Sequence, residues 1–418
     1  MTTNEELFTR GTRVIPGGVN SPIRAFNAVG GTPYVVASAT GATVTDVEGT
    51  TYHDLVQSYG AIIAGHAHPA IVDAVTRAAS RGTSYGAPTE SEVLLAEAIV
   101  DRVASVDKVR LVSSGTEATM TAIRLARGAT GRSTVVKFAG NYHGHGDALL
   151  AQSGSALAVF ALPDSVGVTE STVADTRVVP YNSVPELDET VAAVIVEPIA
   201  ANMGLIAPVD GFLDGLRAEC DRVGALLIFD EVITGFRVAR GGAQELFGVR
   251  ADLTTFGKVI GGGCNIGAYG GRADLLDQMA PDGPVFQAGT LSGNPLATAA
   301  GLAALDLLDD AAYPRLTAGA ERLAGHFEAA FADAGITACV PRVASLVGVH
   351  FGETLPTTYD EAKSTDEARF AAFFHAMLDA GVALAPGAYE AMFPGLAHTD
   401  DIIDAIGAAA RSAARSIA

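Results

Sequence analysis

Helical and strand-like segments alternate along the chain from about residue 70 to about residue 310. Apolar runs predict strands, and stretches with a 3.6-residue apolar period predict helices. The expected strands are 108–112, 133–138, 192–197 and 225–229, and the expected helices include 117–128 and 211–223. Such alternation is typical of a mostly parallel sheet with helices on both faces. The central part of the sequence therefore predicts an α/β fold.

The two ends of the chain have different patterns. Residues 1 to about 60 predict a short helix, a turn-rich loop and a small antiparallel meander with strands near 34–36, 42–46 and 51–55. From about residue 311, amphipathic helices such as Tyr313–Ala334 and a strand near Val347–Phe351 predict a smaller α/β unit. We therefore expect three parts. They are an N-terminal segment (1–60) that packs with the small domain, a large domain (61–310) and a small C-terminal domain (311–418).

Composition narrows the class of function. The chain has 418 residues, 49% of them hydrophobic, and a formal net charge of −20 that argues against nucleic-acid binding. Its three cysteines are far apart and lack metal-ligand spacing, which fits a reducing cytosol. The N-terminus lacks the regions of a signal peptide, and no apolar run reaches the length of a membrane span. We expect a cytoplasmic protein without a membrane segment.

Two histidines lie two positions apart in the segment Gly65-His-Ala-His-Pro69. No carboxylate or cysteine lies close enough in the sequence to complete a metal site. Proline is favoured in the first turn of a helix, so we predict a helix start at Pro69 and no metal.

Two charged residues mark the edge of the predicted sheet. The apolar run that starts at Ala225 ends at Asp230, and ligands in open α/β sheets bind at the carboxyl ends of the strands. Lys258 follows Gly257 and precedes two apolar residues and three glycines, surroundings that lower the pKa of an amine. Each residue alone is more often a helix cap or a solvated surface group. Together they are the pair that a pyridoxal phosphate enzyme needs.

Two loops before predicted helices have small, hydroxyl-rich side chains. Ser113-Ser-Gly-Thr-Glu117 could bind a phosphate at a helix N-terminus, and it also fits a plain capping box. The two interpretations are compatible. Gln287–Pro295 is a similar loop that could also meet a phosphate.

Three further segments have open alternatives. Tyr142 could stack on a flat ring or pack on the core. Residues 151–182 have little periodicity, which predicts an irregular lid over a site. Arg24, the one cation of the loop Ile15–Phe26, faces either an anion or solvent.

These segments together resemble the class III aminotransferases, which use pyridoxal phosphate on the fold-type I architecture. Phe229–Val232 and Lys258 are shared with the family as a whole. The loop Pro16–Phe26 and the segment Gln287–Pro295 are closer to its glutamate-1-semialdehyde 2,1-aminomutase branch, and the similarity extends over nearly the whole chain. The resemblance implies a large domain with a mostly parallel seven-stranded sheet flanked by helices, plus a smaller C-terminal α/β domain.

The resemblance also implies roles for individual residues. Lys258 would form the Schiff base with pyridoxal 5'-phosphate and shuttle protons, and Asp230 would keep the pyridine nitrogen protonated. The other implied cofactor-binding residues are Ser114, Gly115, Thr116, Tyr142, Asn202 and Thr290. The implied substrate-binding residues are Ser21, Arg24, Ser155 and Glu390. Thr290 would reach the phosphate of the neighbouring subunit, so the resemblance implies a homodimer.

A few positions differ from the family pattern. Tyr59 stands where tryptophan is common, and Gly387 replaces a common serine. Three more differences surround Ser155, namely Gln152, Ser153 and Ala156. The differences concern the lid and the small domain and leave the implied cofactor residues unchanged.

The implied reaction is an internal exchange of amino groups. It converts glutamate 1-semialdehyde to 5-aminolevulinate for tetrapyrrole synthesis, while the cofactor alternates between its pyridoxamine and pyridoxal forms. The alternative is a class III aminotransferase that acts on another amino acid and needs a keto-acid acceptor. A non-catalytic binding protein on the same scaffold is a third hypothesis, and the presence of both Asp230 and Lys258 argues against it.

Overall fold

The computed structural model describes residues 2–150 and 165–418, and its largest sheet has seven strands in the order β4-β10-β9-β8-β7-β5-β6. The strands are β4 (Lys108–Val112), β5 (Thr134–Phe138), β6 (Thr176–Val179), β7 (Val191–Val196), β8 (Leu226–Asp230), β9 (Leu253–Phe256) and β10 (Gly267–Gly271). β10 pairs antiparallel with β4 and β9, and the other neighbours pair in parallel. The mostly parallel seven-stranded sheet is therefore confirmed.

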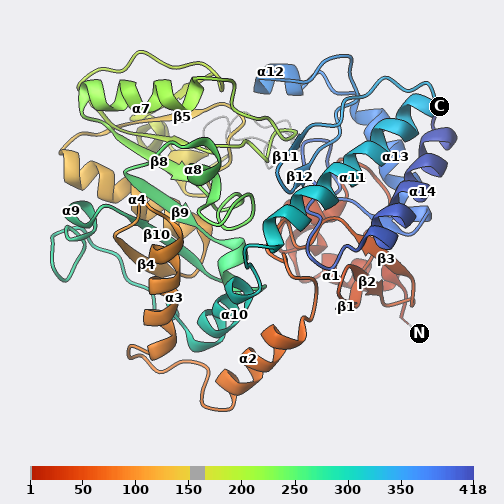
Figure 1. Cartoon of the computed structure of the whole chain (residues 1–418), viewed down its shortest axis with the longest axis horizontal. Coiled ribbons are helices and arrows are strands. Elements are labelled where there is room, and N and C mark those ends of the chain that lie inside the picture. Colours follow the sequence, from red (N-terminus) through yellow and green to blue (C-terminus); the bar gives the residue numbers. More distant parts are fainter. Residues whose placement is uncertain (1, 151–164) are drawn as a thin grey trace.

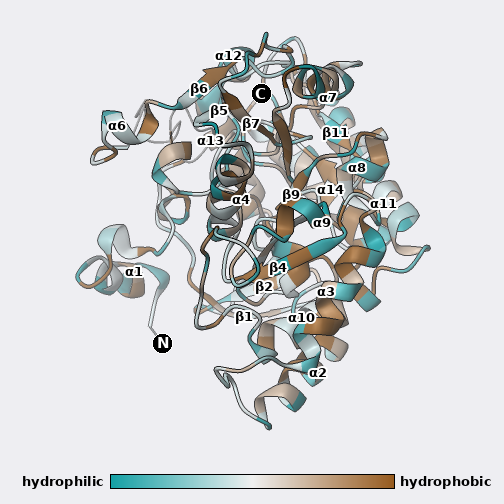
Figure 2. Cartoon of the chain, turned by 90° about the vertical axis from the view of Figure 1, so that its left-hand side faces the viewer, coloured by the Kyte–Doolittle hydropathy of each residue, from teal (hydrophilic) through white to brown (hydrophobic). Residues whose placement is uncertain are grey.

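Helices cover both faces of this sheet. The helices with side chains in the clusters that contain its strands are α3 (Glu90–Arg102), α4 (Gly115–Thr130), α7 (Phe212–Val223), α9 (Ala273–Leu276) and α10 (Pro295–Asp306). The same part of the chain also contains α2 (Pro69–Ala79), which packs on α10, and the short helices α6 (Glu170–Val173) and α8 (Gly242–Phe247). Alternate residues of β7 point to opposite faces: Val194 packs in the cluster that contains α7, and Ile195 packs in the cluster that contains α4. Burial on both faces explains the uninterrupted apolar runs of these strands. Figure 2 shows hydrophobic colours along β7 and β9.

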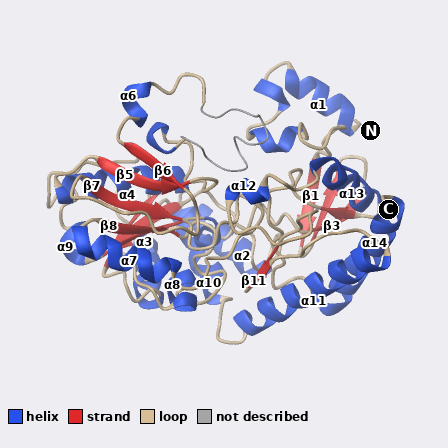
Figure 3. Cartoon of the chain, turned by 90° about the horizontal axis from the view of Figure 1, so that it is seen from above, coloured by secondary structure: helices blue, strands red, loops and turns tan. Residues whose placement is uncertain are grey.

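A second group of elements lies beside the large sheet (Figure 1). The strands β1 (Val36–Thr40), β2 (Thr43–Asp46) and β3 (Thr51–Asp54) form the antiparallel meander that the sequence predicts. The short strand β13 (Val382–Ala383) pairs in parallel with β3 and so joins the C-terminal part of the chain to the N-terminal part. Figure 3 shows the large sheet on one side of the molecule and β1 and β3 on the other.

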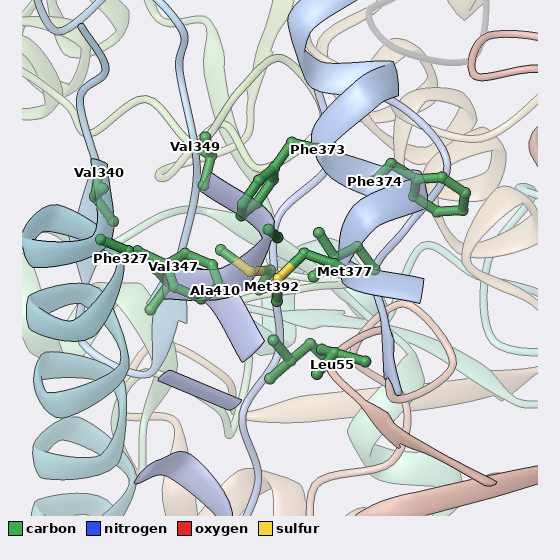
Figure 4. Close-up of a cluster of buried hydrophobic side chains, with 14 of the residues drawn as sticks. Leu55, Phe327, Val340, Val347, Val349, Phe373, Phe374, Met377, Met392 and Ala410 are labelled. Atoms are coloured by element: carbon green, nitrogen blue, oxygen red, sulfur yellow. The ribbon is translucent and has the colours of Figure 1, made fainter. Parts of the chain in front are cut away.

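Three helices of this group enclose an apolar core, namely α11 (Ala312–Asp333), α13 (Glu367–Asp379) and α14 (Asp400–Ser416). The helix α1 (Asn4–Thr12) has no buried residue, and α12 (Tyr359–Ala362) packs through Ala362 in the cluster that contains α7. Figure 4 shows Leu55 from the N-terminal segment beside Phe327 of α11, Met377 of α13 and Ala410 of α14. These contacts support a division of the chain near residues 60 and 310, which stays a prediction.

Two details of the sequence prediction are wrong. The strand expected over Val347–Phe351 is only β12 (Leu346–Val347), which pairs with β11 (Arg342–Val343). Beyond it, Val349 and Phe351 are apolar because they pack in the core of the helical group. The expectation of irregular chain up to residue 182 fails as well, because α6 and the edge strand β6 lie within it.

Candidate active site

A cavity of about 520 Å³ lies where five strands of the large sheet end or lead into loops. β4 leads to Ser114, β5 to Tyr142 and His143, β7 to Glu197, β8 to Asp230 and β9 to Lys258, and all six side chains line the cavity. Ligands of open α/β sheets bind at this edge. The fold thus brings together residues from distant parts of the sequence.

Asp230 is held by three donors. The imidazole Nδ1 of His143 donates to Oδ2 at 2.7 Å, and Oδ1 accepts the Thr255 hydroxyl at 3.1 Å and the Val232 N–H at 3.1 Å. The carboxylate is 5% exposed. A buried carboxylate needs such donors, and they fix its orientation toward the cavity.

His143 is neutral in this environment. Burial lowers its pKa, although the hydrogen bond and charge of Asp230 act in the opposite direction. Its Nδ1 carries the hydrogen that Asp230 accepts, so Nε2 is the unprotonated nitrogen. Nε2 is buried and has no partner among the described residues.

Glu197 is a second buried carboxylate beside the cavity. Burial raises its pKa to about 8, and the charge of Asp230 adds to the effect. The N–H groups of Tyr142 and Ala201 and the amide of Asn202 donate to it at 2.6, 3.2 and 2.9 Å. Glu197 therefore fixes two of the expected cofactor residues, Tyr142 and Asn202, relative to each other.

Lys258 points its amine into the same region. Nζ donates to the Tyr59 carbonyl at 2.8 Å, and burial lowers the pKa of the amine to about 8. The residue has φ 46°, a left-handed conformation that a side chain rarely adopts without support from its surroundings. A lysine with this pKa is about one-tenth neutral at pH 7, whereas an ordinary lysine is almost fully protonated, and a nucleophile requires the neutral form.

The N-terminus of α4 forms the other end of the cavity. Ser114 caps the helix by accepting the Glu117 N–H at 3.2 Å, and Glu117 accepts the Ser113 N–H at 2.7 Å. Ser114 is thus the helix cap, whereas the return bond of a capping box goes to Ser113 instead of Ser114. The first N–H groups of a helix have no acceptor within it, so those at Gly115 and Thr116 are available to an anion.

Backbone packs closely against this helix start. A Cβ at Gly267, the first residue of β10, would lie 2.2 Å from the Ser114 carbonyl oxygen. A Cβ at Gly144, whose φ is +80°, would lie 2.4 Å from the Thr116 hydroxyl. Glycine is required at both positions because a side chain would displace the loop.

The expected substrate residues are distributed around the opening. Ser21 and Glu390 line the cavity, whereas Arg24 is exposed beside it on the turn Pro22–Ala25. Thr290 is exposed and does not line the cavity of this chain. Ser155 lies outside the described residues, as do Gln152, Ser153 and Ala156.

Sequence reasoning missed several residues that shape the site. His143 and Thr255 bind Asp230, and the Tyr59 carbonyl binds Lys258. A signal for His143 was its position next to Tyr142 at the end of a strand. Glu197 was expected at the end of the strand 192–197 on the same sheet edge, and only its contacts with Tyr142 and Asn202 were missed.

No helix in the described part of the chain has the length and apolarity needed to cross a membrane. Residues 2–150 and 165–418 also contain no cluster of three or more histidine, cysteine or acidic side chains suited to a metal ion.

The chain is similar to proteins of known name. The family model described as Aminotransferase class-III matches residues 26–409. A glutamate-1-semialdehyde 2,1-aminomutase from Laribacter hongkongensis (strain HLHK9) is 52% identical and aligns over 99% of each chain. An omega-transaminase from Sphaerobacter thermophilus has a TM-score of 0.88 and 31% identity, covering 99% of this chain and 98% of its own. A glutamate-1-semialdehyde-aminomutase from Pseudomonas aeruginosa PAO1 in complex with PMP has a TM-score of 0.87 and 26% identity, covering 98% and 93%.

Proposed function

Because the chain belongs to the class III aminotransferase family, whose cofactor is pyridoxal 5'-phosphate, we propose that it converts glutamate 1-semialdehyde, (S)-4-amino-5-oxopentanoate, to 5-aminolevulinate. The observation that carries the proposal is the meeting of Lys258 and Asp230 at one cavity, in a chain similar along its whole length to an aminomutase of that name. The reaction is an isomerisation within tetrapyrrole synthesis. It moves an amino group and needs no second substrate.

The residues of the cavity fit the cofactor. The N-terminus of α4 at Gly115 and Thr116 suits a phosphate, because free N–H groups and the helix dipole favour an anion. The buried carboxylate of Asp230 suits a protonated pyridine nitrogen, and the Tyr142 ring suits a flat aromatic face. Lys258 provides the amine that links to the cofactor aldehyde.

The bound cofactor supplies an electron sink that stabilises negative charge on the substrate carbon. Asp230 holds a proton at the ring nitrogen, and His143 and Thr255 hold Asp230 in place. When it is not bound to the cofactor, the Lys258 amine would act as a base that accepts and returns protons at the substrate carbons. Its lowered pKa suits this exchange near neutral pH.

Substrate binding is assigned to Ser21, Arg24 and Glu390 around the opening, with Ser155 in the segment outside the described residues. The Arg24 guanidinium would pair with the substrate carboxylate, which is the strongest hydrogen-bonding group of this substrate. Support comes from the exposed position of Arg24 beside the cavity-lining Ser21. Asn202 is assigned to the oxygen of the cofactor ring.

We also propose a homodimer in which Thr290 completes the phosphate site of the partner. Thr290 is exposed in the single chain, and two large apolar side chains one and four residues from it in the sequence are exposed as well, Leu291 (52%) and Phe286 (68%). Exposed apolar groups of this size favour a partner surface. A cytoplasmic location is part of the proposal and is supported by three free cysteines, Cys220, Cys264 and Cys339.

One assay separates the aminomutase from an aminotransferase. Purified enzyme in the pyridoxamine form is given glutamate 1-semialdehyde alone, and 5-aminolevulinate is measured over many turnovers. We expect continued product formation without pyruvate or 2-oxoglutarate, and none with the Lys258→Ala control. If product forms only when a keto acid or a second amine is added, the protein is an aminotransferase and the proposal fails.

A further inference from the structure

Arg237 is a fully buried arginine that has no acidic partner within residues 2–150 and 165–418. Its side chain is 1% exposed, and burial alone lowers the pKa of the guanidinium to about 9. Buried arginines are normally paired with carboxylates. In the described ranges, Arg237 instead donates from Nη2 to the Gly60 carbonyl at 2.9 Å, and Nη1 lies 3.5 Å from the Pro394 carbonyl. Its guanidinium carbon lies 5.4 Å from the centre of the Phe393 ring.

The turn that contains Gly60 and the ring of Phe393 also contact the Lys258 amine. Nζ of Lys258 donates to the Tyr59 carbonyl, one residue before the carbonyl that Arg237 binds. Nζ also lies 6.0 Å from the centre of the Phe393 ring. Two cationic side chains therefore bind successive carbonyls of one turn and contact one aromatic ring.

The shared turn has an unusual backbone. Gln57, Ser58, Tyr59 and Gly60 have φ angles of 43°, 52°, 54° and 89°, all in the left-handed region. A run of non-glycine residues in this region persists only where surrounding contacts enforce it. Asp54 binds the start of the turn through the Gln57 N–H at 3.2 Å, and Arg237 binds its end.

Phe393 closes the turn from its other side. A Cβ at Gly60 would meet the Phe393 ring at 2.8 Å and Nε of Arg237 at 3.5 Å. No side chain fits at this position, so the backbone of the turn lies directly against the arginine and the ring.

We propose that Arg237 is a positioning residue for Lys258: it fixes the turn that presents the Tyr59 carbonyl to the amine, and its positive charge favours the neutral form of that amine. The inference rests on the proposed role of Lys258 as the cofactor lysine. It assigns a task to a buried charge that neither the phosphate site nor the Asp230 site uses.

The charges around Lys258 show why the arginine matters. Burial is the main cause of the lowered pKa of Lys258, and the charge of Arg237 lowers it further. The carboxylates of Glu390, Glu197 and Asp230 all raise it. Without the positive charge of Arg237, burial alone opposes the three carboxylates, so the amine is protonated to a higher pH.

Lys258 can be titrated without cofactor and without an activity assay. Cofactor-free protein is treated with a trace of acetic anhydride between pH 6 and 11, and acetylation of each lysine is measured by mass spectrometry. Only neutral amines react, so the pH dependence reports the pKa of each amine. Lys108 and Lys363, both in exposed ion pairs, are internal references.

In the wild type, we expect Lys258 to titrate near pH 8, well below Lys108, whose pKa is raised by its pairing with Asp277. In Arg237→Met, its midpoint should rise by about one pH unit, so its acetylation at pH 8 falls about fivefold relative to wild type. Arg237→Lys retains a cation and should lie between the two. Arg240→Met is the matched control, because Arg240 forms a surface pair with Asp101, and it should leave Lys258 unchanged.

Two results would overturn the inference. The first is a folded Arg237→Met protein in which Lys258 titrates as in the wild type. The second is a wild-type Lys258 that titrates together with Lys363. This result needs no variant, so it can be obtained even if both substitutions prevent folding. Conversely, absence of aminomutase activity in a protein with the expected titration would remove the proposed function alone.

Discussion

His143 and Asp230 are 87 positions apart in the sequence, yet Nδ1 of the imidazole and Oδ2 of the carboxylate are 2.7 Å apart. Both side chains are buried, and the neutral imidazole has its hydrogen on the nitrogen that faces Asp230. The histidine therefore fixes the carboxylate by a directed hydrogen bond. An ion pair would require a protonated histidine, which burial disfavours.

The first prediction concerns this bond. His143→Ala should lower kcat by about 10- to 100-fold, the equivalent of losing a hydrogen bond to a charged group, with little change in KM. His143→Asn places an amide N–H near the position of Nδ1 and should retain most of the activity. Steady-state kinetics of both purified variants test this. Equal loss in the two variants would show that the imidazole matters for packing and not for the bond.

The second prediction concerns pH. Burial lowers the pKa of Lys258 to about 8, so the neutral, reactive fraction of the amine falls about tenfold for each pH unit below 8 and changes little above it. The rate at which cofactor-free protein forms a borohydride-reducible bond to pyridoxal phosphate should rise from pH 6 to 8 and then level off. A simple alkylamine, measured as a control, should continue to gain rate toward pH 10. A protein curve that follows the alkylamine would contradict the lowered pKa.

The third prediction concerns Thr290. Thr290→Val should weaken cofactor retention, because the phosphate of the partner site loses one hydroxyl donor. Dimers that combine a Thr290→Val subunit with a Lys258→Ala subunit place both defects in one site and leave the other site intact. Mixing the two variants at limiting cofactor should therefore restore about a quarter of wild-type activity, because half of the dimers are hybrids. No restoration would mean that Thr290 serves its own subunit or none.

The fourth prediction concerns Arg24. Arg24→Ala should raise KM for glutamate 1-semialdehyde by about tenfold or more and change kcat less, because an interaction present in both ground and transition states is lost. Arg13→Ala, an exposed arginine on the same N-terminal segment, is the control and should have no effect. If both variants behave like the wild type, another group binds the carboxylate.

The sequence alone was sufficient to predict the positions of the strands that are buried on both faces. β7 and β8 were located to within one residue, because an apolar run between turns leaves few alternatives. β10 was not found, because its sequence Gly-Ala-Tyr-Gly-Gly lacks a strand pattern and its conformation depends on pairing with β4 and β9.

The candidate site likewise contains some residues that the sequence predicts and others that only the fold reveals. Asp230 and Lys258 could be proposed from the sequence because each follows a recognisable strand or glycine pattern. The link from His143 to Asp230 could not, since it joins two loops that only the sheet brings together. Arg237 was missed because charged residues are expected at the surface, and only the fold shows its burial.

The contact between Gly267 and the Ser114 carbonyl limits how this protein can change during evolution. β10 begins a few residues after Lys258 and lies directly against the start of α4, so the spacing between the amine and the phosphate loop is set by backbone atoms alone. A cofactor has a fixed length, and even one added methyl group at Gly267 would displace the start of α4, where its phosphate would bind. Substrate preference can therefore diverge through changes in the loops at the cavity opening, while the backbone that surrounds the cofactor phosphate stays the same.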